Sequence, residues 1–230
     1  MNLLVAADVF FYDRPGGGAR VPWEIARGFA RRGHQVFYLV RQWEPARDNE
    51  ILEGVQIIRF GSRRQSLIAA LLSGMAAVRR LKERIDLYHL HQPLPALAVL
   101  LGTRFKAIPR IYFFHSPWNK EFLIREEFRG GVGLVSRAKA TLRRFIEHFV
   151  ISRAQLVLMF SKFMQCELGQ VHSYPSSKSI LLNGAVDTGR FHPNESQARS
   201  RELLNWPGDS TVMLTVRNLE PRMGIENLLS

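Results

Sequence analysis

Short apolar runs alternate with longer helical patterns along most of this chain, and that alternation limits the folds open to it. Runs rich in Val, Ile, Leu and aromatic residues are typical of strands buried on both faces, and parallel strands need helical crossovers between them. The alternation therefore predicts an α/β fold with a parallel sheet. We expect strands at 2–9, 35–40, 55–60, 86–91, 110–115, 156–160 and 179–183, and helices at 19–32, 65–83, 94–102, 133–153 and 162–170.

The character of the sequence changes after residue 187. Residues 188–210 are polar and include two prolines, which predicts a connection between domains. We therefore expect a first domain at 1–187 and the start of a second at 211–230, opening with a strand at 211–216. Because an apolar strand with no sheet to join would expose an aggregation-prone edge, the second domain is expected to be incomplete. The chain is then a fragment, or a shortened version, of a longer protein.

A formal net charge of +12 requires an anionic partner or environment. Nucleic acid, an anionic membrane face and phosphorylated small molecules all meet that requirement. Binding to nucleic acid is not expected, because no RNA- or DNA-binding motif accompanies the charge. The single cysteine, Cys166, excludes an intramolecular disulfide and a thiolate metal cage. With no signal peptide and no membrane-spanning run, we expect a cytoplasmic protein, either dispersed or peripheral at the inner face of the membrane.

One predicted helix carries much of the charge. Between Arg129 and Arg153 there are six basic residues and one acidic residue. Apolar residues recur at helical spacing in the same stretch, at Leu134, Ala138, Leu142, Phe145, Ile146 and Phe149. Cations beside an apolar stripe are found on ordinary solvated helices and on helices that dock on anionic bilayers, and both interpretations stay open.

Three glycines, Gly16, Gly17 and Gly18, lie between the first predicted strand and the first predicted helix. Glycines let the backbone approach a ligand closely, and the N-terminus of the following helix presents N–H groups to an anion. The loop matches neither the dinucleotide-binding glycine pattern nor the P-loop. It is therefore interpreted either as an anion-binding loop or as a tight turn.

Histidines stand at the ends of two predicted strands: His89 and His91 end one, and His115 ends another. Ligands of open parallel sheets bind at the carboxyl ends of the strands. His115 begins an aromatic, proline-containing loop, which makes it the candidate functional histidine. His89 and His91 share one side of a strand, but only one acidic residue, Asp86, is near them, so no metal site is expected.

Five segments, in this order along the chain, resemble family 4 glycosyltransferases: the glycine loop and residues 24–36, 115–118, 183–191 and 217–224. The resemblance spans nearly the whole chain. It implies the GT-B architecture, in which two Rossmann-like domains, each with helices on both faces of a parallel sheet, face each other across a cleft. The first domain would bind mainly the acceptor and the second mainly the nucleotide-sugar. Retaining transfer of a hexose, with no metal or other cofactor, is the implied activity.

The same resemblance implies donor-binding residues. The donor phosphates would be bound by Gly16, Gly17, Gly18, Arg217 and Arg222. Aligned on Gly224, the family's usual Arg falls at Asn218 and its usual Lys at Met223, so the flanking arginines are expected to substitute. The family's acidic Glu-x7-Glu motif has no counterpart before Ser230, and we expect the donor pocket to be incomplete.

On the acceptor side, the resemblance places Trp118 and Glu121 at the cleft and makes His115 the catalytic residue near the donor sugar. A solvated loop carboxylate is the alternative interpretation of Glu121. The partners implied are a nucleotide-sugar and a carbohydrate or lipid-linked acceptor. We expect a retaining glycosyltransferase fragment that is inactive alone. The alternative is a non-catalytic basic module that binds an anionic membrane or a partner subunit.

Overall fold

The computed structural model describes residues 1–43, 50–62, 64–104, 107–193, 196–216 and 224–225. The chain divides into two compact units, Met1–Leu182 and Asn183–Ser230, and each is described by itself.

Eight strands form one sheet in the first unit, in the order β3-β4-β2-β1-β5-β6-β7-β8. They are β1 (Asn2–Ala7), β2 (Gln35–Arg41), β3 (Glu50–Leu52), β4 (Val55–Phe60), β5 (Leu87–Leu90), β6 (Arg110–Phe113), β7 (Leu156–Met159) and β8 (Ser179–Leu181). Neighbouring strands pair in parallel, except β3 and β4, which pair antiparallel. The predicted parallel sheet is confirmed, and its short edge strand β3 was not predicted.

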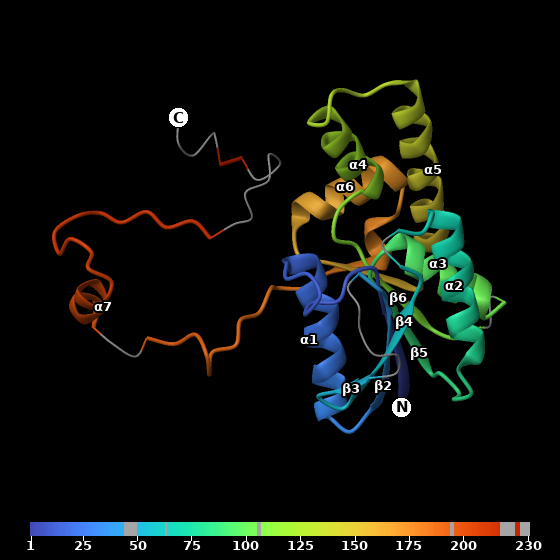
Figure 1. Cartoon of the computed structure of the whole chain (residues 1–230), viewed down its shortest axis with the longest axis horizontal. Helices are drawn as coiled ribbons and strands as arrows, with labels where there is room; N and C mark the ends of the chain where they lie inside the picture. The colour runs from blue at the N-terminus through green and yellow to red at the C-terminus, as the bar shows by residue number, and fades with distance from the viewer. Residues whose placement is uncertain (44–49, 63, 105–106, 194–195, 217–223, 226–230) are drawn as a thin grey trace. The chain divides into compact units, whose positions relative to one another are not determined.

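Helices cover both faces of this sheet (Figure 1). They are α1 (Gly17–Arg31), α2 (Leu67–Arg80), α3 (Pro93–Gly102), α4 (Trp118–Glu127), α5 (Leu134–Ile151) and α6 (Lys162–His172), with a 3₁₀ turn, η1, at Ser176–Lys178. All five predicted helices form, each within three residues of its predicted ends. Helix α4 was not predicted. The fold class, a Rossmann-like sheet between two helical layers, is confirmed.

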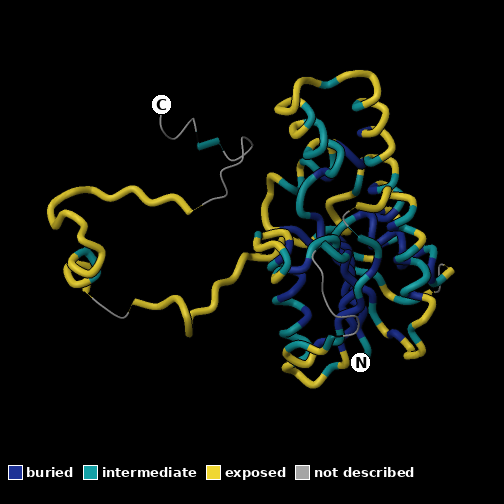
Figure 2. Tube along the Cα trace, viewed as in Figure 1, coloured by how far each residue is buried: buried dark blue, intermediate teal, exposed yellow. Residues whose placement is uncertain are grey.

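Two apolar cores lie on opposite sides of the sheet. Figure 2 shows the buried segments gathered at the strands and the helices next to them. Successive residues of β1 alternate between them, because side chains of a strand point to opposite faces. Leu4 and Ala6 belong to the core covered by α2, α3 and α5, whereas Val5 and Ala7 belong to the core that Trp23 of α1 closes. This central strand is completely buried from Leu3 to Ala7, which explains its continuous apolar sequence.

Helices α4 and α5 pack against each other as a hairpin, and α5 also packs against α3. The hairpin extends past the carboxyl ends of the strands (Figure 1). The end of the hairpin formed by the start of α4 and the last turns of α5 is therefore close to the edge of the sheet where ligands bind in folds of this kind.

The second unit contains the short helix α7 (Gln197–Leu203), which Ser196 caps by accepting a hydrogen bond from the Arg199 N–H at 3.3 Å. The strand predicted at 211–216 is not formed. An apolar, β-rich segment becomes a strand only when a neighbouring strand shares its backbone hydrogen bonds, and no described residue pairs with this one. Along the described ranges, no helix combines the length and the apolarity that crossing a membrane demands.

Candidate functional site

The candidate site lies at the carboxyl ends of β1 and β5, the two central strands. The chain places β2 on one side of β1 and then crosses through α2 to place β5 on the other side. At such a change of direction the loops after the two central strands part and leave a crevice, which is where ligands of open α/β sheets bind.

The glycine loop forms one side of this edge. Gly16 precedes α1, and no described side chain caps this helix or places an acidic group in its first turn. A Cβ atom added to Gly16, Gly17 or Gly18 would meet no described atom within 4 Å. The helix N-terminus is therefore open to an anion, in the position predicted for the donor phosphates.

Gln92, two residues after the end of β5, joins that loop to the sheet by hydrogen bonds. Its Nε2 donates to the Gly18 carbonyl at 3.2 Å, and its Oε1 accepts from the Asp8 N–H at 2.8 Å. One amide side chain thus joins the ends of β1 and β5 to the first turn of α1. Gln92 was not among the predicted site residues, although it directly follows His91 at a predicted strand end.

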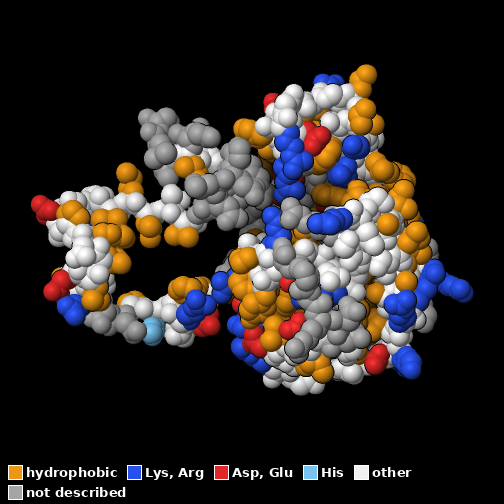
Figure 3. All heavy atoms as spheres, viewed as in Figure 1, with side chains coloured by type: hydrophobic (Ala, Val, Ile, Leu, Met, Phe, Trp, Pro, Cys, Tyr) orange, Lys and Arg blue, Asp and Glu red, His pale blue; other side chains and the backbone are white. Residues whose placement is uncertain are grey.

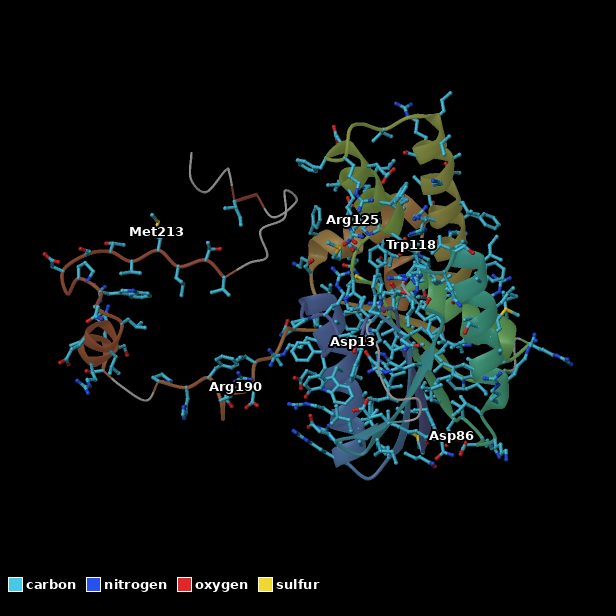
Figure 4. The ribbon with its side chains drawn as sticks, viewed as in Figure 1. Asp13, Asp86, Trp118, Arg125, Arg190 and Met213 are labelled. Carbon is cyan, nitrogen blue, oxygen red and sulfur yellow. The ribbon has the colours of Figure 1, made fainter. Side chains whose placement is uncertain are left out.

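A cavity of about 190 Å³ opens at the same edge, lined by Asp8, Arg41, Leu67, Gln92, Pro93, Leu94, Trp118, Phe122, Arg125 and Arg143. Figure 4 shows Trp118 and Arg125 between the α4–α5 hairpin and the sheet. Trp118, predicted to bind the acceptor, is in this lining. The predicted Glu121 is outside the lining; it accepts a hydrogen bond from the Ser116 hydroxyl at 2.5 Å and pairs with Arg125 at 3.3 Å.

Two polar side chains of this cavity have unused hydrogen-bonding atoms. Oδ1 of Asp8 and Nε of Arg41 are buried and accept or donate no hydrogen bond within the described part of the chain. The nearest approach between the two side chains, Arg41 Nη1 to Asp8 Oδ1, is 3.9 Å. Burial raises the pKa of Asp8, and the Arg41 charge opposes the rise. Buried polar atoms are rarely left unpaired, so these two are suited to a polar ligand such as a sugar.

The three strand-end histidines form a chain of hydrogen-bonded rings. His89 Nδ1 lies 2.9 Å from His91 Nε2, and His91 Nδ1 lies 3.1 Å from His115 Nε2. Phe113 stacks on both His91 and His115, with interplanar angles of 11° and 29°. The His115 ring is thus held on one edge by His91 and on one face by Phe113, and its Nδ1 has no hydrogen-bond partner among the described residues.

Burial keeps these imidazoles neutral. It lowers the pKa of His89 to about 4, with the nearby His115 adding to the effect. Burial likewise lowers the pKa of His115 to about 4, although Glu121 opposes the shift, and it lowers the pKa of His91 well below the usual value. A neutral ring carries one N–H, so His91 and His115 can each donate at one nitrogen and accept at the other.

A buried carboxylate positions the helix that carries Trp118. Glu147 of α5 is 1% exposed, and its Oε2 accepts from the Trp118 N–H at 2.9 Å and lies 3.1 Å from His172 Nε2. The Tyr112 hydroxyl donates to its other oxygen at 3.4 Å. Burial raises the pKa of Glu147, and these three contacts oppose the rise. Glu147 was not among the predicted site residues; in the sequence it is the one acidic residue of a basic helix.

The predicted site residues are partly brought together. The glycine loop, His115 and Trp118 lie at one edge of the sheet, linked through Gln92 and the histidine chain. Arg217 and Arg222 lie outside the described residues. Within the described ranges, no group of three or more His, Cys, Asp or Glu side chains is arranged to hold a metal ion.

Comparisons with known proteins point to one family. The model of the family described as Glycosyltransferase Family 4 matches residues 15–190. Among solved structures, sucrose-phosphate synthase from Thermosynechococcus elongatus is similar with a TM-score of 0.76 and 18% identity, over 99% of this chain and 58% of that one. HepE from Anabaena, in complex with UDP and glucose, is similar with a TM-score of 0.56 and 15% identity, over 89% of this chain and 50% of that one.

The catalytic domain of starch synthase IV from Arabidopsis thaliana, bound to ADP and acarbose, is also similar, with a TM-score of 0.54 and 14% identity over 85% of this chain and 54% of that one. At these identities the likeness concerns the fold. The chain spans between half and three fifths of the length of these three proteins. No curated protein sequence matches it.

Proposed function

This chain belongs to glycosyltransferase family 4, and from that premise we propose that it forms the acceptor side of an enzyme that transfers a hexose from a nucleotide-sugar to an acceptor with retention of configuration. The solved neighbours HepE and starch synthase IV carry UDP with glucose and ADP with acarbose, which supports a nucleotide-sugar as the donor. We propose that these 230 residues alone bind acceptor and do not transfer sugar. We also propose a cytoplasmic location.

The observation that carries the proposal is the meeting of three features at one sheet edge: an open helix N-terminus, a neutral histidine and a cavity with unsatisfied polar atoms. The first suits a diphosphate, whose departure develops negative charge that fixed N–H groups can meet. The third suits hydroxyl groups, because Asp8 and Arg41 supply an unused acceptor and an unused donor beside Trp118.

His115 is proposed to orient the reacting sugar. Because its Nε2 is bound by His91 Nδ1, only Nδ1 is available to contact a substrate hydroxyl. A neutral ring makes that contact without adding a positive charge beside the leaving phosphate. The direction of the hydrogen bonds along the three rings decides whether His115 Nδ1 donates or accepts, so His91 and His89 act on the substrate only through His115.

Acceptor binding to the 230-residue chain tests the proposal. A panel of mono- and oligosaccharides is titrated and followed by saturation-transfer NMR. Trp118→Ala is expected to weaken binding roughly tenfold, since an aromatic side chain that lines a binding cavity often contributes more than 1 kcal/mol. Phe163→Ala removes an aromatic ring that is 66% exposed on α6 and is expected to leave the affinity unchanged.

Two results would count against the proposal. One is that no saccharide binds, which would favour the alternative of a non-catalytic basic module. The other is that Trp118→Ala and Phe163→Ala behave alike, which would move the acceptor away from the cavity. Sugar transfer by the purified 230-residue chain, assayed with labelled UDP-, ADP- and GDP-sugars, would contradict the inactivity of these residues alone.

A further inference from the structure

Helix α5 has exposed apolar residues on its outer side, whereas Ile146 and Phe149 of the predicted stripe pack against the core. Its buried residues are Ala140, Glu147, Val150 and Ile151. The outer stripe, defined by Leu134, Val135, Leu142 and Phe145, is 86%, 68%, 56% and 66% exposed. With the exposed Ala138 between them, these residues recur at helical spacing and lie on one side of the helix. Packing in the core therefore does not explain this outer stripe.

The sequence of α5 around the outer stripe is basic. Between Glu127 and Glu147 the sequence contains five basic residues and no acidic residue. Arg137 and Lys139 are exposed and flank the stripe on its two sides. Figure 3 shows hydrophobic and basic side chains, with a few acidic ones among them, on the part of the molecule formed by α4 and α5. An anionic partner with an apolar layer fits this surface on both counts.

A lipid bilayer has that chemistry. Exposed apolar patches on soluble proteins mark interaction sites, and a helix with an apolar face between rows of cations lies in the interface of anionic membranes. Nucleic acid would match the cations but has no apolar layer in which Leu142 and Phe145 could both be buried. We propose that the outer stripe of α5 docks on an anionic bilayer, with Leu142 and Phe145 among the acyl chains and Arg137 and Lys139 at the level of the lipid phosphates.

Docking through α5 would hold the cavity beside the membrane. Arg143, one residue after Leu142, points inward instead: its guanidinium lies 3.8 Å from the centre of the Phe122 ring, and both residues line the cavity. The same helix thus presents its outer stripe to the bilayer and Arg143 to the cavity. Membrane docking itself does not depend on the proposed transferase function, and its test uses no sugar.

Vesicle sedimentation of the 230-residue chain is the first experiment. The wild type is expected to bind vesicles of mixed phosphatidylglycerol and phosphatidylcholine, and to stay in solution with phosphatidylcholine alone. Arg137→Gln with Lys139→Gln is expected to weaken binding roughly 30-fold, since each cation near such a surface contributes about 1 kcal/mol. Leu142→Gln with Phe145→Gln is expected to weaken it at least tenfold, about 1.4 kcal/mol.

Ile51→Gln is the matched control. Ile51 is 73% exposed on β3, so its replacement changes surface apolarity away from α5 and is expected to leave vesicle binding unchanged. Equal binding to neutral and anionic vesicles, or equal loss in Ile51→Gln and in the stripe variant, would overturn the proposal.

A label on the stripe is the second experiment. Cys166, the single cysteine, is replaced by serine, and Phe145→Cys then carries an environment-sensitive dye. Anionic vesicles are expected to shift its emission to the blue, while the same dye on Ile51→Cys does not respond. If the stripe variants instead change the sedimentation coefficient without lipid, the surface joins copies of the chain, and membrane docking is refuted.

Discussion

The protein is expected to lose stability as the pH falls from about 8 to about 5, and replacing His89 by phenylalanine is expected to make this loss about 2 kcal/mol smaller. Burial, assisted by the nearby His115, lowers the pKa of His89 from its ordinary 6.5 to about 4. As the pH falls, the unfolded chain therefore takes up a proton at His89 before the folded chain does. The stability linked to this group is complete above about pH 6.5 and is lost as the pH falls toward 4.

The size of the effect follows from the two pKa values. At about pH 5 the unfolded imidazole is mostly protonated and the folded one mostly neutral, which corresponds to about 2 kcal/mol. Urea unfolding at both pH values gives the loss for each protein, and comparing each variant with itself removes any packing cost of the substitution. His192→Phe replaces an exposed histidine of the second unit, and this variant is expected to lose as much stability between the two pH values as the wild type does.

A His89→Phe variant that loses as much stability on acidification as the wild type does would refute this prediction. In that case His89 would not be held neutral by burial in the folded state. Should the phenylalanine variant fail to fold, His89→Gln removes the same titrating group with a smaller, uncharged side chain, and the comparison is unchanged.

Three further substitutions test the packing around the site. Gly74→Ala is expected to cost about 1 to 2 kcal/mol in urea unfolding, because a Cβ there would lie 2.8 Å from Ala98 Cβ; an unchanged midpoint would contradict the close packing of α2 on α3. Glu147→Ala is expected to cost about 3 to 5 kcal/mol of stability, and Glu147→Gln less than half of that, since the amide oxygen can still accept from the Trp118 N–H. Equal melting temperatures of these two variants would argue against this network. Ser161→Ala is expected to cost about 1 kcal/mol by removing the cap of α6, whose hydroxyl accepts from the Met164 N–H at 3.2 Å, and an unchanged thermal midpoint would refute that role.

The sheet was predictable because its strands are buried on both faces. β1 and β2 consist almost entirely of buried apolar residues, so their sequence alone marks them as interior strands. β3 has three residues, none of them buried, so its sequence contains no run of apolar residues that would predict a strand. Helix α4 buries no residue and shows no apolar periodicity; it is held instead by Glu147, which is distant in sequence. Contacts of that kind are set by the tertiary fold.

The site was predictable in outline. Strand-end position singled out His115, but its hydrogen bond to His91 depends on how β5 and β6 pair. Asp8 directly follows β1 and Gln92 lies two residues after β5, so a list of the polar residues near the end of each strand would have included both. The spacing of α5 revealed an amphipathic helix, yet spacing cannot say which side faces the core. The strand predicted at 211–216 was wrong for a related reason, since an apolar segment forms a strand only when a neighbouring strand shares its hydrogen bonds.

The central place of β1 in the sheet also governs when this protein can finish folding. On one side Leu3 pairs with Val36, and on the other with Leu87. During synthesis the first partner appears early, whereas the second follows only after β4 and α2 have been made. Until then one edge of β1 remains open, and closing so long a loop is slow. A chain whose synthesis ends before Leu87 would contain the glycine loop but not β5, which positions His89 and Gln92 beside that loop. The crevice therefore forms only in chains whose synthesis has passed β5.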